Sequence, residues 1–110
     1  MTYSLSLTAG LSLYMHEKPI LKDLMAKAIP RIGRQWNQVG LQLDMEDYLL
    51  DAIPSDDPEN GGKQMFQQWL NGKKGSGGKP RTWESVLNAI EASIGSEVRK
   101  EVEAVLRQQN

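Results

Sequence analysis

Three tryptophans, each inside a short segment with the apolar spacing of a helix, constrain this sequence most. Trp36, Trp69 and Trp83 are separated by intervals that suit one helix and one connection. A tryptophan buries roughly 150–250 Å² when it packs, so three of them in a chain of 110 residues mark the core of a small domain. A chain of this length buries about 60–70% of its unfolded surface around a single core. The sequence therefore predicts one all-α domain.

Residues 1–18 lack the helical spacing of the rest of the chain. Tyr3, Leu5 and Leu7 alternate with small polar residues, as in a short strand, but the sequence offers no partner strand. We expect a disordered or loosely docked arm over residues 1–18 and a folded domain over residues 19–110. A strand that pairs with a neighbouring domain or with a second chain is the alternative.

Two prolines shape the first two expected helices. Pro19 suits the first turn of a helix, which the apolar spacing predicts over residues 19–29. Pro30 disfavours helical geometry at Ile29 and can itself open a second helix, whose apolar stripe continues to Leu43. The two helices should therefore meet at an angle at Pro30.

Two further helices are expected in the middle of the chain. Asp44 offers an N-terminal cap for a short third helix over residues 45–53, which Pro54 ends. The fourth helix is expected over residues 59–71. The pair Gly61-Gly62 would weaken its first turn, since glycine costs about 1 kcal/mol in a helix, so its start is poorly defined by the sequence.

A basic loop and two helices complete the expected fold. Residues 73–81 contain glycines, a proline and basic side chains but no apolar residue, which predicts an exposed, mobile loop. Thr82 should cap the fifth helix. Gly95 should end that helix and Ser96 should cap the sixth, which continues towards the end of the chain.

The apolar stripes of these helices define the predicted core. Its members repeat every three or four residues along each helix, which places them on one face. They are Leu24, Ile32, Trp36, Val39, Leu43, Leu49, Ile53, Phe66, Trp69, Leu70, Trp83, Leu87, Ile90, Val98 and Val102.

The charged residues are segregated along the sequence, although the formal net charge is only -1. That near balance argues against a general polyanion binder. Residues 35–62 contain seven acids and no Lys or Arg, whereas basic residues are concentrated on both sides of this stretch. The acidic run is either an ordinary solvated face or part of a polarised binding surface.

The tryptophans and their neighbours resemble the death domain, a six-helix interaction module of apoptotic and inflammatory signalling. Ile32-Gly33 precedes Trp36 in the second helix, Trp69 lies near the end of the fourth, and Thr82-Trp83 opens the fifth. The resemblance covers about residues 19–108. It implies an all-α, six-helix antiparallel bundle of the death-fold Greek-key type. Gly40 departs from the family pattern, and costs helix stability unless a tight helix crossing needs the space.

The resemblance also implies a non-catalytic adaptor whose partners are other death-domain proteins, homotypic or heterotypic. In this family, a surface of the second and third helices of one module meets the first and fourth helices of another. The residues that this implies for an acidic face are Asp44, Glu46, Asp47, Asp51, Asp56 and Asp57. Those implied for basic faces are Lys22, Lys27, Arg31, Arg34, Lys73, Lys74, Lys79 and Arg81.

The sequence holds little that could perform catalysis. It contains no cysteine, and His16 is its one histidine, so neither a zinc site of the usual composition nor a hydrolytic triad is expected. Residues 73–79 do not match a phosphate-binding loop, because the glycine and lysine order differs. We therefore expect no enzymatic activity, no cofactor and no small-molecule substrate.

A helix-turn-helix domain that binds nucleic acid is the alternative from another functional class. Such a domain needs a basic recognition helix, but the expected third helix is acidic and the fifth has no Lys or Arg. No apolar run approaches the ~20 residues that cross a bilayer, and the N-terminus lacks a secretory signal pattern. We expect a cytoplasmic protein that binds neither nucleic acid nor membrane.

Overall fold

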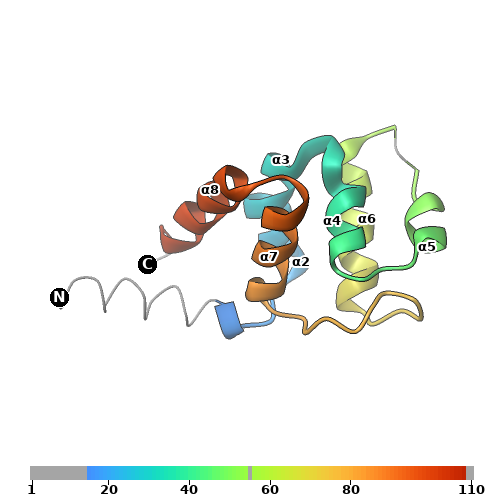
Figure 1. Ribbon diagram of the computed structural model, residues 1–110. Coiled ribbons are helices and arrows are strands. Elements are labelled where there is room, and N and C mark those ends of the chain that lie inside the picture. Colours follow the sequence, from blue (N-terminus) through green and yellow to red (C-terminus); the bar gives the residue numbers. More distant parts are fainter. Residues whose placement is uncertain (1–14, 55, 109–110) are drawn as a thin grey trace.

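The computed structural model describes residues 15–54 and 56–108, which form helices joined by loops (Figure 1). No strand occurs within these residues, so the expected all-α class is confirmed. None of their helices is long and apolar enough to cross a membrane. The elements are α2 (Leu21–Asp23), the π-helix η1 (Leu24–Ala28), α3 (Ile29–Ile32), the 3-10 helix η2 (Gly33–Gln35), α4 (Trp36–Gln42), α5 (Asp47–Asp51), α6 (Pro58–Leu70), α7 (Trp83–Ser93) and α8 (Ser96–Arg107).

The expected N-terminal arm lies mostly outside the described residues, which begin at Met15. The last residues of that arm contact the helical domain. Met15 is partly buried against the core, and the carbonyl oxygen of Glu17 accepts a hydrogen bond of 3.1 Å from the amide of Trp83. Pro19 is fully buried. The segment just before α2 is therefore attached to the first turn of α7.

The first two expected helices form one bent helical run, so the described residues hold five such runs where six helices were expected. A proline ring normally clashes with the carbonyl group four residues earlier. Here Pro30 follows a π-helical turn, in which the amide of Ile29 binds the carbonyl of Leu24, five residues back. The wider turn makes room for the ring. The expected angle at Pro30 is wrong: the backbone leaves helical geometry at Gly33, with φ 60° and ψ -134°.

The chain between α4 and α5 also differs from expectation. Asp44 does not cap α5; it lies in the left-handed region with φ 67°, which aspartate tolerates better than most residues. Glu46 takes the N-cap position, and its side chain makes no capping hydrogen bond. The third helix is therefore shorter than the expected 45–53.

The ends of the last three helices mostly follow local signals. Asp57 caps α6, since its side chain accepts a hydrogen bond from the amide of Glu59. Thr82 caps α7 through the amide of Ser85 at 3.3 Å, as expected. The expected cap of α8 is wrong, because Gly95 takes the N-cap position and Ser96 is the first helical residue.

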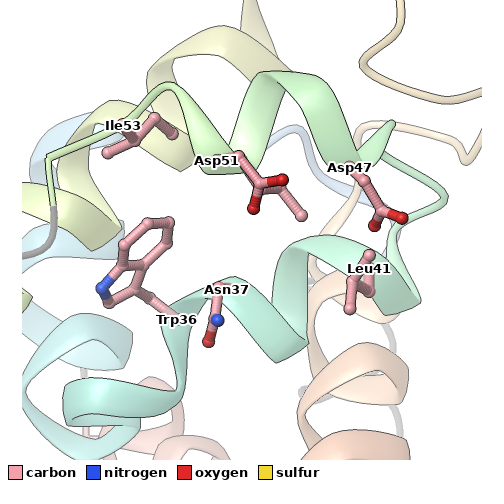
Figure 2. A pocket seen from close by; sticks show the side chains of 7 residues that line it. Trp36, Asn37, Leu41, Asp47, Asp51 and Ile53 are labelled. Atoms are coloured by element: carbon pink, nitrogen blue, oxygen red, sulfur yellow. The ribbon is translucent and has the colours of Figure 1, made fainter.

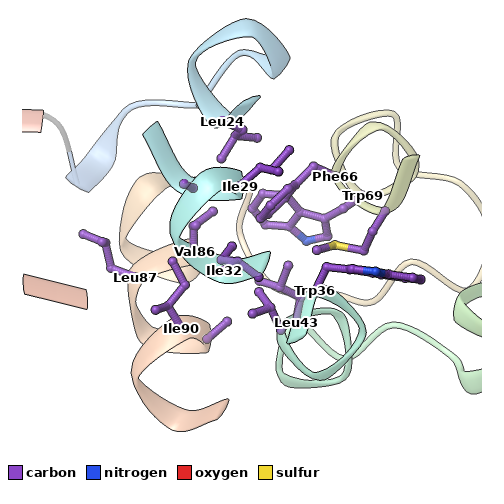
Figure 3. Close-up of a cluster of buried hydrophobic side chains, with 14 of the residues drawn as sticks. Leu24, Ile29, Ile32, Trp36, Leu43, Phe66, Trp69, Val86, Leu87 and Ile90 are labelled. Atoms are coloured by element: carbon purple, nitrogen blue, oxygen red, sulfur yellow. The ribbon is translucent and has the colours of Figure 1, made fainter. Parts of the chain in front are cut away.

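The core surrounds α4, which packs against α6 on one side and α7 on the other (Figures 1 and 3). Trp36, Trp69 and Trp83 are 5%, 0% and 3% exposed, which confirms their expected burial. Every predicted core residue is buried except Leu70 and Val98, which are partly buried at its edge. The core also contains Ala28, Ile29, Met45, Leu50, Met65, Val86, Ala89 and Leu106.

Two glycines allow the helices around α4 to approach closely. A Cβ atom on Gly61 of α6 would lie 2.5 Å from Cε2 of Trp36, closer than two carbons can pack. A Cβ atom on Gly40 would lie 2.7 Å from Cδ2 of Leu50. Gly40 therefore occupies the tight crossing that would justify its cost in helix propensity.

We predict that Gly61→Ala destabilises the domain, although alanine is the better helix former by about 1 kcal/mol. The new methyl group must displace the Trp36 indole from a packed core, which typically costs 1–3 kcal/mol. Gly78→Ala is the matched control, because a Cβ atom there meets nothing within 4 Å. Urea unfolding of both variants checks the prediction.

The same contact can be isolated by a double-mutant cycle. Trp36→Phe removes part of the ring that the alanine would strike, so Gly61→Ala should cost less in that background than in the wild type. If the unfolding free-energy changes of the two substitutions are additive, the destabilisation by Gly61→Ala does not arise from its contact with the Trp36 indole.

Candidate functional site

A hollow of about 210 Å³ opens between α4 and α5 (Figure 2). We call it the α4–α5 hollow. Its walls combine apolar side chains with two carboxylates, and it is lined by Trp36, Asn37, Leu41, Asp47, Leu50, Asp51 and Ile53.

The position of the two carboxylates follows from the anchoring of α5. Leu49 and Leu50 are each 5% exposed: Leu50 packs in the core, and Leu49 lies beside the loop at Gly75. Asp47 and Asp51 are four residues apart, so they lie on the same side of the helix. Figure 2 shows both side chains reaching from α5 towards α4. The packing of the two leucines therefore presents a pair of carboxylates to the hollow.

These two carboxylates form no ion pair with any residue that the structure describes. Among residues 15–54 and 56–108, no side-chain nitrogen of Lys, Arg or His lies within 4.0 Å of a carboxylate oxygen of Asp47 or Asp51. Leu41, on the opposite wall, is 45% exposed. The hollow thus places unpaired negative charge beside accessible apolar surface.

A second hollow of about 260 Å³ adjoins the first. It is lined by Arg34, Trp36, Asn37 and Pro58, so it shares Trp36 and Asn37 with the α4–α5 hollow. Arg34, which precedes α4 in the chain, is exposed. The carboxylates of α5 and the guanidinium of Arg34 therefore belong to two adjoining hollows that meet at Trp36.

The other predicted acidic residues have separate environments. Asp44 approaches Lys79, with 4.0 Å between the carboxylate oxygen and Nζ. The backbone amide of Glu46 donates a 2.8 Å hydrogen bond to Gly75. Asp56 and Asp57 are both exposed, and Asp57 caps α6. The acidic run of the sequence therefore does not form one uniform face.

The basic loop is docked rather than freely exposed. Ser76 is only 2% exposed, and a Cβ atom on Gly77 would lie 2.4 Å from the carbonyl oxygen of Leu43. Gly75 and Gly77 have φ of 89° and 87°, a conformation that glycine adopts without strain. The expected exposed loop is wrong for its centre, where glycines let the chain lie against the α4–α5 connection.

Arg81 holds this loop in place. Its guanidinium donates to the carbonyls of Trp69, Gly77 and Lys79 at 2.8–2.9 Å and to Oγ of Ser76 at 2.8 Å. It also lies 5.5 Å from the centre of the Trp69 ring, within cation–π range. These contacts occupy a side chain that was expected to bind a partner.

Two other predicted basic residues also have partners within the domain. Lys27 is 7% exposed and lies 3.4 Å from the carboxylate of Asp23. Arg31 is partly buried and donates to the carbonyl of Lys27. Lys22, Arg34, Lys73, Lys74 and Lys79 are exposed, and of these Lys79 forms the ion pair with Asp44.

The apolar part of the hollow was not among the predicted partner-binding residues. Leu41 lies outside the stripe that Trp36, Val39 and Leu43 form, and an apolar residue on the polar face of a helix is the signal that could have found it.

Among the described residues, no cluster of three or more His, Asp or Glu side chains is placed to hold a metal ion.

No family model matches this chain, and comparisons with curated proteins and with solved structures give no match either. The death-domain resemblance therefore rests on the residues and the helices of the chain itself.

We predict that Arg81→Lys destabilises the domain by about 2 kcal/mol or more. A single ammonium cannot reach all the acceptors that the guanidinium serves. Each hydrogen bond to a charged group contributes ~1.5–3 kcal/mol, so the loss of even one is measurable. Urea unfolding measures the loss. Hydrogen exchange at the amide of Glu46, which binds Gly75, should accelerate if the loop detaches. Lys79→Ala is the control in the same loop, since its exposed ion pair is worth at most about 1 kcal/mol. Equal losses in both variants would rule out a special role for Arg81.

Proposed function

We propose that this chain is a non-catalytic protein–protein interaction module of the death-domain type, which joins other death-domain proteins in apoptotic or inflammatory signalling. The observation that carries the proposal is the α4–α5 hollow, whose two carboxylates have no ion-pair partner among the described residues and lie beside the exposed Leu41. The order of the helices and the buried tryptophans at the matching positions support the same family. The proposal places the module in the cytoplasm.

The character of the hollow fits a protein partner. Protein interfaces combine an apolar centre with charged groups at the rim that set orientation and association rate. Leu41 and the carboxylates of Asp47 and Asp51 provide this combination within one small area. A complementary partner surface carries basic side chains around an apolar contact.

The exposed basic residues supply surfaces for further contacts. Lys73 and Lys74 lie close to α5, because the hydroxyl of Tyr48 donates to the carbonyl of Lys74 at 3.4 Å. Lys22 lies on α2, the first element of the bent helical run and not part of the loop that carries Lys73 and Lys74. Contacts between an acidic surface of one module and a basic surface of the next are heterologous, so they can extend into larger assemblies.

Nucleic-acid binding gains no comparable support. The exposed residues of α7, the helix that would have to read bases, are Asn88, Glu91 and Ala92. A recognition helix without a basic side chain cannot make the usual contacts to phosphates or to guanine.

We predict that reversing both carboxylates, Asp47→Lys with Asp51→Lys, weakens binding to a death-domain partner about tenfold or more, which corresponds to ~1.4 kcal/mol. Titration against a panel of purified death domains, at low and at moderate salt, measures the change. Salt should slow association of the wild type, since exposed charges are screened beyond ~8–10 Å.

The matched control is Glu97→Lys with Glu101→Lys on α8, which changes the charge equally at two exposed positions also four residues apart. It should leave affinity nearly unchanged, and circular dichroism should show intact helices in both double variants. Lys73→Glu with Lys74→Glu tests the basic loop in the same titration. If no member of the panel binds, or if the α5 and α8 reversals have equal effects, the proposed use of this surface is wrong.

A further inference from the structure

We propose that Asn71 is a site of spontaneous deamidation, and that its conversion to aspartate and isoaspartate loosens the docked loop, residues 73–81. The inference does not depend on the proposed function, because the reaction takes place within this chain and consumes only water. The site lies where the end of α6 leads into that loop (Figure 1).

An asparagine followed by glycine is the pair that undergoes this reaction most readily. The backbone nitrogen of the glycine loses its proton and attacks Cγ of the asparagine, so a new C–N bond forms. The bond between Cγ and the side-chain nitrogen breaks, and that nitrogen takes up a proton and leaves as ammonia. Water then opens the resulting succinimide ring at either carbonyl, which gives aspartate or isoaspartate. Glycine favours the attack because it has no Cβ atom to restrict the backbone.

The chain contains two such pairs, Asn60-Gly61 and Asn71-Gly72, and both asparagines are exposed. The first pair lies within α6, where the amide of Gly61 donates a 2.8 Å hydrogen bond to the carbonyl of Asp57. Gly61 is also buried, and its backbone lies against the Trp36 indole. Ring closure at Asn60 must therefore move the backbone out of the core, and we expect the fold to protect this pair.

The second pair lies at the end of α6, where the backbone is less constrained. Asn71 is the C-cap, and Gly72, which is exposed, has a φ of 66°. A Cβ atom on Gly72 would meet nothing within 4 Å, so no other element packs against it. The amide of Gly72 must release one hydrogen bond, of 3.1 Å to the carbonyl of Trp69, before its nitrogen can attack. Helix ends open in this way far more often than the core does, which makes Asn71 the reactive asparagine.

The product alters the turn that attaches the docked loop to α6. The carbonyl of Trp69 also accepts a 2.8 Å hydrogen bond from Nε of Arg81. The amide of Lys73 donates to the carbonyl of Gln68 at 3.2 Å. Isoaspartate adds one atom to the backbone before Gly72, so the amides that follow cannot reach these carbonyls with unchanged geometry. Both products also place a negative charge at the negative end of the α6 dipole.

The effect on the loop can be observed at α5. The amide of Ser76 donates to the carbonyl of Lys73 at 2.8 Å, and the carbonyl of Gly75 accepts a 2.8 Å hydrogen bond from the amide of Glu46. A displaced Lys73 therefore disturbs the part of the loop that binds Glu46. Hydrogen exchange at the Glu46 amide reports this change far from Asn71 in the sequence.

The test follows both asparagines in the full chain during incubation at mildly alkaline pH. Trypsin cleaves after Arg34, Lys63 and Lys73, so Asn60 and Asn71 fall in separate peptides. Mass spectrometry then measures the replacement of each side-chain amide by a carboxyl group. In the folded protein, Asn71 should convert about tenfold faster than Asn60 or more, because only Asn60 requires the core to open. In concentrated urea the two should convert at similar rates, since each is followed by glycine.

Asn71→Gln is the matched control, because glutamine keeps the amide but can close only a slower, six-membered ring. After incubation, exchange at the Glu46 amide should be about fivefold faster in the wild type and unchanged in Asn71→Gln. The amide of Ile90, in the buried part of α7, is the internal reference and should keep its rate.

Equal conversion of the two asparagines in the folded protein, or no conversion at Asn71, would overturn the site. Unchanged exchange at Glu46 in fully converted protein would overturn the effect on the loop. Equal acceleration at Glu46 and Ile90 would show general unfolding and would also overturn that effect.

Discussion

The contact between the Trp36 indole and the backbone of Gly61 determines how the helices around α4 can pack. The indole fits against α6 because Gly61 has no Cβ atom, which would otherwise lie 2.5 Å from the ring. Gly40 plays the corresponding part towards Leu50 of α5. Both α6 and α5 can therefore approach α4 closely, while the opposite side of α4 packs against α7. Two residues that are poor helix formers in isolation are favoured here because close packing outweighs their local cost.

This packing also creates the hollow, since Trp36 belongs both to the core and to the hollow wall. The burial of Leu49 and Leu50 fixes the orientation of α5, and that orientation turns Asp47 and Asp51 towards α4. The docked loop supports the same region from outside, through hydrogen bonds from the amide of Glu46 and from the hydroxyl of Tyr48. Arg81 links this loop to the end of α6, so the position of α5 depends on residues far away in the sequence.

The parts of the fold that depend on periodicity were predictable. Nearly every residue that the apolar stripes predicted for the core is buried, and Thr82 was correctly placed as the cap of α7. The errors occur where a distant contact changes a local preference. Pro30 normally interrupts a helix, but a preceding π-turn accommodates it, and the bend occurs at Gly33. The loop before α7 has no apolar residue, yet its backbone and Arg81 dock it through polar contacts that composition does not reveal.

The acidic run shows why charge along a sequence is a poor measure of charge on a surface. Its residues are close together in the chain, but Asp44 lies 4.0 Å from Lys79 and Asp57 caps the start of α6, so members of the run have different surroundings. Asp47 and Asp51 differ because they line the hollow near Leu41 and form no ion pair with any residue in the part of the chain that the structure describes. A carboxylate without an ion-pair partner gains more from an incoming cation than one that is already paired. The affinity of this surface for a basic partner should therefore depend on these two side chains far more than on the number of acids around them.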